Sequence, residues 1–400
     1  MLTGPTAELL PSRAVLGSAG PLPALEPLQE TGEELSVVVQ GSLYAGNLAE
    51  IATVCAHWRA LFPRAEIILA IAGTDLFEQT SGTARDVQGF EFSPTHRLNG
   101  TLQVGARRLA QACDRIVLSE GALPLPPIKF DPKVNNANLQ IVAAKAGLAR
   151  ATRPYALRVR SDFLFLDRSL MAFYARNALL PREPEAVFRQ RIMISPYFTL
   201  NPFTMERLPF HFSDWFHFGL REDIQKFWAV EEMSVATATY FEGHRHPPEA
   251  NRLERKFRVR FAVEQYVAFS SLSQHINDLQ LSHIIDHRSV DRSMRILLND
   301  FLVYNPKEVP TAFDKYARAF RDPSMELLCI TYPQWRALLD LLPDADFRSY
   351  YAKAARRAEW EILIRENPVL KPVKFVRGAW RLLHRRKDEV KEILDEVRRT

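Results

Sequence analysis

The feature that most constrains this chain is an apolar strand at positions 155–162 that ends abruptly in charged residues. Arg158 and Arg160 lie two positions apart, and Ser161 and Asp162 follow directly. Because side chains two apart on a strand point the same way, both arginines and Asp162 are expected on one face. Three charges on a central strand are costly to bury, and a phosphorylated ligand with a metal ion would satisfy them. Open α/β sheets bind ligands at the carboxyl ends of their strands, so the segment predicts such a site, with a plain salt bridge or helix cap as the alternative.

The segments around this strand predict an α/β protein with a mixed, mostly parallel sheet flanked by helices. Apolar runs alternate with stretches that carry apolar residues at helical spacing, and this alternation is typical of parallel sheets. Four parallel strands are therefore expected before residue 165, and Asn47 is placed to cap the first helix. The expected strands are 35–40, 66–72, 115–120 and 295–303 besides the one above, and the expected helices are 47–62, 135–150 and 257–273.

The composition is that of an ordinary soluble protein, with 47% hydrophobic and 25% charged residues among 400. Its three cysteines form no C-x-x-C pair, which argues against a disulfide scaffold or a zinc ribbon. Neither a secretory signal nor a run of about 18 apolar residues is visible, so we expect a cytoplasmic protein or one peripheral to the inner face of the cell membrane. No P-loop or G-x-G-x-x-G follows a strand, which leaves those nucleotide-binding classes without support.

Basic residues gather at the end of the chain. Positions 351–400 carry 14 Lys or Arg against 8 Asp or Glu, so the preceding part is close to neutral and a nucleic-acid surface is not expected there. Over 371–387, basic and apolar side chains fall on separate helical faces. Such a helix either lies in a membrane interface or docks on the protein with its basic face in solvent. We expect a flexible leader at 1–34, a main domain at 35–305 and a helical region at 306–400 that ends in this tail.

Seven sequence blocks follow one another in a fixed order, and with them the chain resembles the WavE lipopolysaccharide-synthesis family. These bacterial proteins look like glycosyltransferases of the GT-A type. The resemblance extends roughly from residue 36 to residue 304, and it implies that 35–305 is a GT-A-like domain for a nucleotide-sugar donor. The blocks are 39–41, 62–75, 138–148, 157–162, 212–219, 260–266 and 299–301.

The resemblance also implies roles for particular residues. It places the donor pocket at the ends of the first two strands and beside the helix that precedes the central strand. It places Arg160-Ser161-Asp162 where the common pattern has an Asp-x-Asp metal motif, so Asp162 is the expected ligand of a divalent metal, Mn²⁺ or Mg²⁺. Because the first acid is replaced by Arg160, whose planar fork suits a diphosphate, strict metal dependence stays open. The donor-binding candidates are Gln40, Gly41, Asp75, Asn138, Gln140, Arg158, Arg160 and Ser161.

An inverting transferase needs a carboxylate that takes the proton of the acceptor hydroxyl. Glu264, at the start of a predicted helix, and Asp214, inside an aromatic block, are the catalytic candidates. The alternative for Glu264 is a first-turn charge that the helix dipole stabilises. The alternative for Asp214 is an ordinary turn residue. Sugars stack on aromatic rings, so Trp215 and Phe216 are candidate contacts for a glycan or lipid-linked glycan acceptor, with core packing as the alternative.

Two other functions compete with a glycosyltransferase of the hexosyltransferase type acting in lipopolysaccharide or surface-polysaccharide assembly. A metal-dependent hydrolase or phosphotransferase would want several carboxylates or histidines on the metal, and the strand end offers one clear carboxylate. A non-catalytic scaffold of an envelope-polysaccharide complex would not need Arg158, Arg160 and Asp162 together. The transferase is therefore the function that the sequence favours.

Overall fold

The computed structural model describes residues 32–77, 84–87, 100–119, 121–316, 325–342 and 344–366. Most of the leader expected at 1–34 and the whole basic tail expected at 371–387 lie outside these residues. Among the helices that are described, none combines the length and the apolar character that a membrane crossing requires.

The described strands form one eight-stranded sheet in the order β3-β4-β2-β1-β5-β8-β7-β9. β4, β2, β1 and β5 run parallel, which confirms the four parallel strands expected before residue 165. β8 is antiparallel to β5 and to β7, and a second, two-stranded sheet pairs β6 with β10. The bounds are β1 (Leu35–Leu43), β2 (Glu66–Thr74), β3 (Arg85–Val87), β4 (Arg115–Leu118), β5 (Tyr155–Arg160), β6 (Leu164–Phe165), β7 (Ile192–Ile194), β8 (Phe216–Leu220), β9 (Phe301–Val303) and β10 (Thr311–Ala312).

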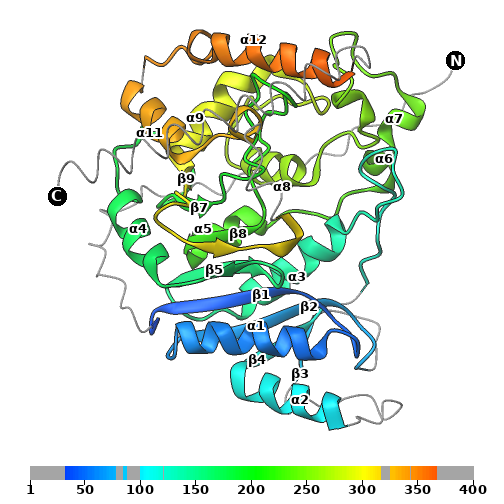
Figure 1. The fold of residues 1–400 in the computed structure, drawn as a ribbon, viewed down its shortest axis with the longest axis vertical. Helices are drawn as coiled ribbons and strands as arrows, with labels where there is room; N and C mark the ends of the chain where they lie inside the picture. The colour runs from blue at the N-terminus through cyan, green and yellow to red at the C-terminus, as the bar shows by residue number, and fades with distance from the viewer. Residues whose placement is uncertain are drawn as a thin grey trace, which may run out of the picture.

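Helices surround this sheet. In Figure 1 the first two helices lie together at the bottom of the molecule, and α12 lies at the top. α3 packs against β1 and β2 and also contacts α5, which in turn contacts α8. The bounds are α1 (Leu48–Leu61), α2 (Gly100–Ala112), α3 (Ala137–Arg150), α4 (Ser169–Asn177), α5 (Arg221–Trp228), α6 (Val235–Ala238), α7 (Tyr240–Gly243), α8 (Val263–Leu272), α9 (Val290–Asp300), α10 (Met325–Leu328), α11 (Tyr332–Leu341) and α12 (Phe347–Glu366).

Two expectations for individual elements were wrong, and a third was wrong in its start, because the helix expected from residue 257 begins at Val263. The strand expected at 295–303 is mostly the helix α9, and only its last three residues form β9. Met294, Leu297 and Leu298 are buried at helical spacing. This spacing is that of a helix, although the same apolar run, taken from the sequence alone, predicts a strand. Asn47 precedes α1 but makes no side-chain cap, because its Oδ1 accepts a hydrogen bond from the N–H of Tyr44 at 2.8 Å and not from a helix N–H.

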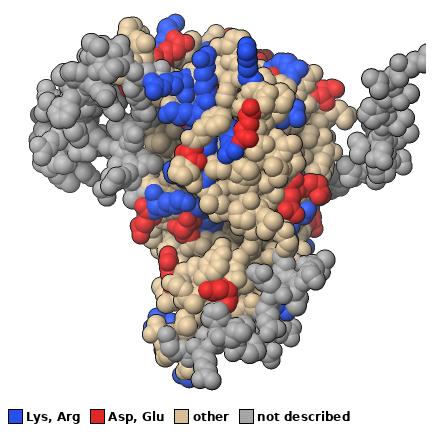
Figure 2. Space-filling model, turned by 90° about the vertical axis from the view of Figure 1, so that its right-hand side faces the viewer, with Lys and Arg blue, Asp and Glu red and all other residues tan. Residues whose placement is uncertain are grey.

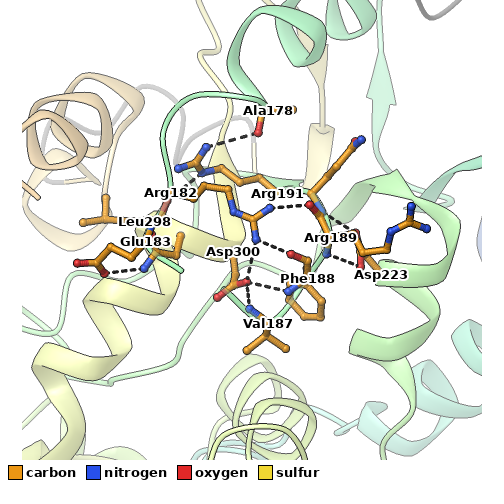
Figure 3. A network of polar contacts seen from close by, with 12 residues as sticks. Ala178, Arg182, Glu183, Val187, Phe188, Arg189, Arg191, Asp223, Leu298 and Asp300 are labelled. Atoms are coloured by element: carbon orange, nitrogen blue, oxygen red, sulfur yellow. Dashed lines mark hydrogen bonds and ion pairs between the residues drawn. The ribbon is translucent and has the colours of Figure 1, made fainter. Parts of the chain in front are cut away.

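A buried arginine fastens the middle of the chain to α9. Arg191 has no exposed surface, and its guanidinium donates hydrogen bonds to the carbonyls of Leu298, Leu180 and Pro181 at 2.9, 2.6 and 2.7 Å. Figure 3 shows a longer one, at 3.4 Å, to the carbonyl of Ala178. The carbonyl of Leu298 lies in the last turn of α9, and those of Leu180 and Pro181 lie in the segment that follows α4. The guanidinium therefore supplies the hydrogen bonds that buried backbone requires.

The last two residues of α9 bind the same region through their side chains. Asp300 accepts hydrogen bonds from the backbone N–H of Val187 and Phe188 at 2.7 and 2.9 Å, and burial raises its pKa to about 6. Asn299 accepts one from the N–H of Glu183 at 3.0 Å. The Asn-Asp pair in the sequence block 299–301 thus has a structural function, which is to hold the segment that leads into β7.

Charged side chains of both signs share the surface drawn in Figure 2. Lys and Arg gather in the upper part of that face, with Asp and Glu among them, while its middle is largely uncharged. The view therefore shows an interleaved pattern rather than one continuous patch of a single sign.

We predict that Gly147→Ala destabilises the fold. A Cβ at Gly147 of α3 would lie 2.5 Å from Cγ1 of Val38 and 2.6 Å from Cβ of Ala70, atoms of β1 and β2. The gain in helix propensity is about 1 kcal/mol, and forcing the helix off the sheet costs about 1–3 kcal/mol, so we expect a net loss of free energy of unfolding. Urea denaturation measures it. Gly243→Ala, where a Cβ meets nothing within 4 Å, is the control and should not lower the midpoint; a higher midpoint for Gly147→Ala would contradict the close packing.

Candidate functional site

The candidate site lies where β1 and β5 end and β8 begins. Since β8 is antiparallel to β5, its first residues lie beside the last residues of β5, and the N–H of Arg160 donates to the carbonyl of Trp215 at 3.2 Å. The N–H of Ser161 donates to the carbonyl of Gln40 at 2.8 Å, which joins the end of β5 to that of β1. This pairing brings Asp214, directly before Trp215, next to the strand end that the sequence singled out.

Arg158 forms the buried base of this site. Its guanidinium donates one hydrogen bond to the carbonyl of Asp214 and one to Oε1 of Gln40. It also lies 4.3 Å from the centroid of the Trp228 ring, within the range of a cation–π interaction. Burial lowers the pKa of Arg158 to about 9, which still leaves it protonated at neutral pH. In this structure the charge therefore holds protein groups, and its expected contact with the donor stays a prediction.

Two glutamines complete a closed network with Arg158. Gln40 Nε2 donates to the carbonyl of Gln140 at 2.5 Å, and Gln140 Nε2 donates to Oδ2 of Asp214. Asp214 is buried, with 5% of its surface exposed. Gln140 holds its carboxylate and Arg158 holds its backbone carbonyl, so both parts of the residue are fixed in position. The network thus connects three donor-binding candidates, Gln40, Gln140 and Arg158, with Asp214, one of the two catalytic candidates.

Arg160 and Asp162 form a bidentate ion pair at the mouth of the same strand end. Nε and Nη2 of Arg160 donate to the two carboxylate oxygens at 2.9 and 2.8 Å. Burial alone would lower the pKa of Arg160, but the hydrogen bonds and charge of Asp162 raise it above its usual range. Burial would likewise raise the pKa of Asp162, and the guanidinium keeps it low. The simpler alternative, a salt bridge, thus describes these two residues, while Arg158 makes separate contacts.

Glu264 reaches the site from the first turn of α8. Its Oε2 lies 3.4 Å from Nε2 of His211, a residue that sequence reasoning did not select although it stands in the aromatic block. Burial raises the pKa of Glu264, and the charge of Asp214 adds to this, while His211 and Arg160 act in the opposite direction. Glu264 and Asp214 are therefore electrostatic neighbours, as two groups of one active site would be.

Tyr316 is a second residue that only the structure reveals. Burial raises the pKa of its hydroxyl, and the charges that act on it are those of Arg160, Glu264, Asp214 and Asp162. The four charged candidates thus lie within electrostatic range of one phenol. Nothing in the local sequence marks this tyrosine, because it follows β10, far along the chain.

Three other candidates have mainly structural contacts. Asp75 accepts a hydrogen bond from the N–H of Ala45 at 2.9 Å and so fastens the loop after β1. Gly41 faces Ser161 so closely that a Cβ would lie 2.5 Å from the hydroxyl oxygen. Asn138 binds both backbone groups of residue 233, at 3.0 and 2.7 Å. Their donor-binding roles remain predictions.

The two aromatic candidates lie in the core. Trp215 is 2% exposed, with its ring centroid 5.1 Å from that of Tyr316, and Phe216 has no exposed surface. Neither ring offers a free face to a sugar in this structure, and the sequence block could not show this because the covering rings come from distant segments. Their expected contact with an acceptor therefore has no support from their placement.

The donor set around Asp162 does not by itself make a metal site. Both of its carboxylate oxygens accept hydrogen bonds from Arg160, and the usual first acid of the motif is that arginine. Across the part of the chain that is described, no three His, Cys, Asp or Glu side chains gather in a way that could hold a metal ion. A divalent metal stays a prediction, and no chemical step below depends on it.

Comparison with known proteins identifies the family. The WavE lipopolysaccharide synthesis family matches residues 128–363, more than half of the chain. The protein belongs to the WavE family. The match includes Arg158, Arg160, Asp162, Asp214 and Glu264, whereas β1 lies before it. The sheet is mixed, mostly parallel and flanked by helices, as the sequence predicted.

Among solved structures, one match is a mannosyltransferase, PcManGT from Pyrobaculum calidifontis, determined in complex with GDP-Man and Mn²⁺. It shares 12% identity, with 87% of this chain and 80% of the other covered, at a TM-score of 0.27. At this TM-score we draw nothing about the WavE protein from the likeness. No curated protein matches the sequence.

We predict that Arg158→Met lowers the free energy of unfolding by about 2–4 kcal/mol, because it leaves two buried oxygens, on Gln40 and Asp214, without their donor. Denaturation monitored by circular dichroism measures it. Arg176→Met removes a surface ion pair with Glu308 and should cost less than about 1 kcal/mol. Equal effects of the two substitutions would show that Arg158 does not hold the site together.

Proposed function

We propose that this WavE-family protein transfers a sugar from a nucleotide-sugar donor to a lipopolysaccharide or surface-polysaccharide acceptor. One observation carries the proposal: Arg160, Asp162, Asp214 and Glu264 gather where parallel strands of the sheet end, inside the region matched by a lipopolysaccharide synthesis family. Ligands of open α/β sheets bind at such strand ends. The cluster combines a cation that could stabilise a leaving diphosphate with carboxylates that could take the proton of an acceptor hydroxyl.

On the donor side, the proposed role of Arg160 is to neutralise the leaving nucleoside diphosphate. A guanidinium presents two parallel N–H groups to phosphate as it does to carboxylate, and in this structure that fork holds the carboxylate of Asp162. A bound diphosphate would compete for the fork. Preorganised positive charge at a leaving group lowers the barrier to transfer without a rearrangement during reaction.

On the acceptor side, we assign the base to Glu264 in preference to Asp214. One oxygen of Asp214 already accepts a hydrogen bond from Gln140, whereas Oε2 of Glu264 lies 3.4 Å from an imidazole nitrogen of His211. The acceptor oxygen would form a bond to the anomeric carbon while the bond from that carbon to the diphosphate breaks. The hydroxyl proton passes to the Glu264 carboxylate, and the nucleoside diphosphate leaves with the bonding electron pair.

The donor part of the proposal is tested by thermal shift with nucleoside diphosphates and nucleotide sugars, with and without Mn²⁺. A ligand that binds only the folded protein raises the midpoint by mass action, and we expect one nucleotide base to do so. Arg160→Gln should weaken that nucleotide at least about tenfold because it removes a charge-assisted contact, while Arg176→Gln, at a surface pair, should not. A shift that needs Mn²⁺ would support Asp162 as a ligand, and no shift with any nucleotide would favour the non-catalytic scaffold.

The acceptor part is tested by Glu264→Gln. Loss of a general base lowers kcat about 10²–10⁴-fold, and nucleotide affinity should hardly change. The matched control is Glu222→Gln, because Glu222 also stands in the first turn of a helix, α5, with an exposed side chain. If both variants kept full transfer activity with the identified donor, Glu264 would be a helix-terminal charge and no base.

A further inference from the structure

His211 stands at a place where the backbone is strained. Among the described residues other than glycine, three have positive φ, namely Phe198, Phe210 and Asp278. Phe210 directly precedes His211, and the carbonyl of Phe198 accepts a hydrogen bond from the imidazole. Such conformations are costly for residues other than glycine, and they persist where the surrounding structure holds them in place. Two of the three therefore serve to aim one imidazole.

The hydrogen bond to Phe198 decides which ring nitrogen carries the proton. Nδ1 of His211 lies 2.8 Å from the carbonyl oxygen, and a carbonyl can only accept, so Nδ1 must be the donor. In the neutral ring Nε2 is then an acceptor with a free lone pair. That lone pair faces Oε2 of Glu264 at 3.4 Å.

Oε2 of Glu264 and Nε2 of His211 are both hydrogen-bond acceptors and face each other in a largely buried place. A proton bound between them would turn this unfavourable contact into a hydrogen bond. We propose that His211 and Glu264 form one acid–base pair that binds a single proton, and that this pair retains the proton of the acceptor hydroxyl during sugar transfer. The second part rests on the proposed function, and the first does not. Before transfer the pair is a carboxylate and a neutral imidazole; afterwards it holds one added proton, shared between Oε2 of Glu264 and Nε2 of His211.

The groups that face the pair set its pH dependence. Asp214, which precedes β8, disfavours a negative charge on Glu264, while Arg160 at the end of β5 favours it. Tyr316, beyond β10, is also within electrostatic range of Glu264. Burial raises the pKa of Glu264. Because the pair accepts a proton only when it is empty, transfer should be lost as the pH falls through the pKa of the pair and regained above it.

The proton sharing is tested on the full-length protein without any substrate, by NMR of ¹⁵N-labelled histidines, with His211→Asn used to assign the signals of His211. We expect the Nδ1–H tautomer when the pair holds no proton. We also expect the Nε2 signal of His211 to shift in Glu264→Gln, because a neutral amide replaces the carboxylate that shares the proton of that nitrogen. An unchanged Nε2 signal would overturn the pair, whatever the activity.

The catalytic part is tested by the pH profile of kcat/KM with the donor found by thermal shift. His211→Asn keeps a donor for the Phe198 carbonyl but places nothing at the Nε2 position, so the acidic limb should move to lower pH and kcat should fall about 10-fold or more. Full kcat with an unmoved limb would overturn it. Coupling seen by NMR without transfer from any donor would instead contradict the proposed function and leave the pair standing. His275→Gln, in an exposed turn after α8, is the control and should change neither readout.

Discussion

The site depends on one buried guanidinium. Arg158 lies in the middle of β5 without exposed surface, and it binds an amide oxygen of β1 and a carbonyl just before β8. A buried charge is tolerated only when its hydrogen bonds are supplied by the surrounding structure. The strands on both sides of β5 are therefore held in register by the same contacts that place Gln40 and Asp214. The contacts of Arg158 therefore stabilise the sheet and position the residues of the site at the same time.

Arg158 is committed to the protein, whereas the side chain of Arg160 remains partly exposed at the strand end, with 25% of its surface accessible. It has no buried oxygen to satisfy and is held by Asp162, a residue two positions away on the same strand end. The partner of Arg160 can thus be exchanged without disturbing the sheet, while that of Arg158 cannot. Two arginines that look equivalent in sequence thus differ in burial: Arg158 holds the strands around the site together, and Arg160 is the one proposed to meet a diphosphate.

The sequence was sufficient to predict the helices and strands that show a clear local pattern of apolar residues. Apolar runs and helical spacing predicted β1, β2, β4, β5, α1 and α3 close to their observed bounds, and hence the mostly parallel sheet. The same reasoning failed at 295–303, where a helix and a strand meet without a turn and the apolar residues suit both. Period alone does not separate the two in a short apolar run.

Features that depend on contacts between distant segments could not be predicted from the sequence. Trp215 and Phe216 stand in the same sequence block as Asp214, yet rings from elsewhere cover them and leave Asp214 in contact with Gln140. His211 stands directly before that block. It is distinguished by its contacts with the carbonyl of Phe198, which precedes it in the chain, and with the carboxylate of Glu264, which follows well after it. Spacing could nominate Glu264 as a carboxylate, but only tertiary structure shows that a histidine with a fixed tautomer faces it. A carboxylate beside such a nitrogen differs chemically from a first-turn glutamate such as Glu222, whose partner is an arginine that never gives up its proton.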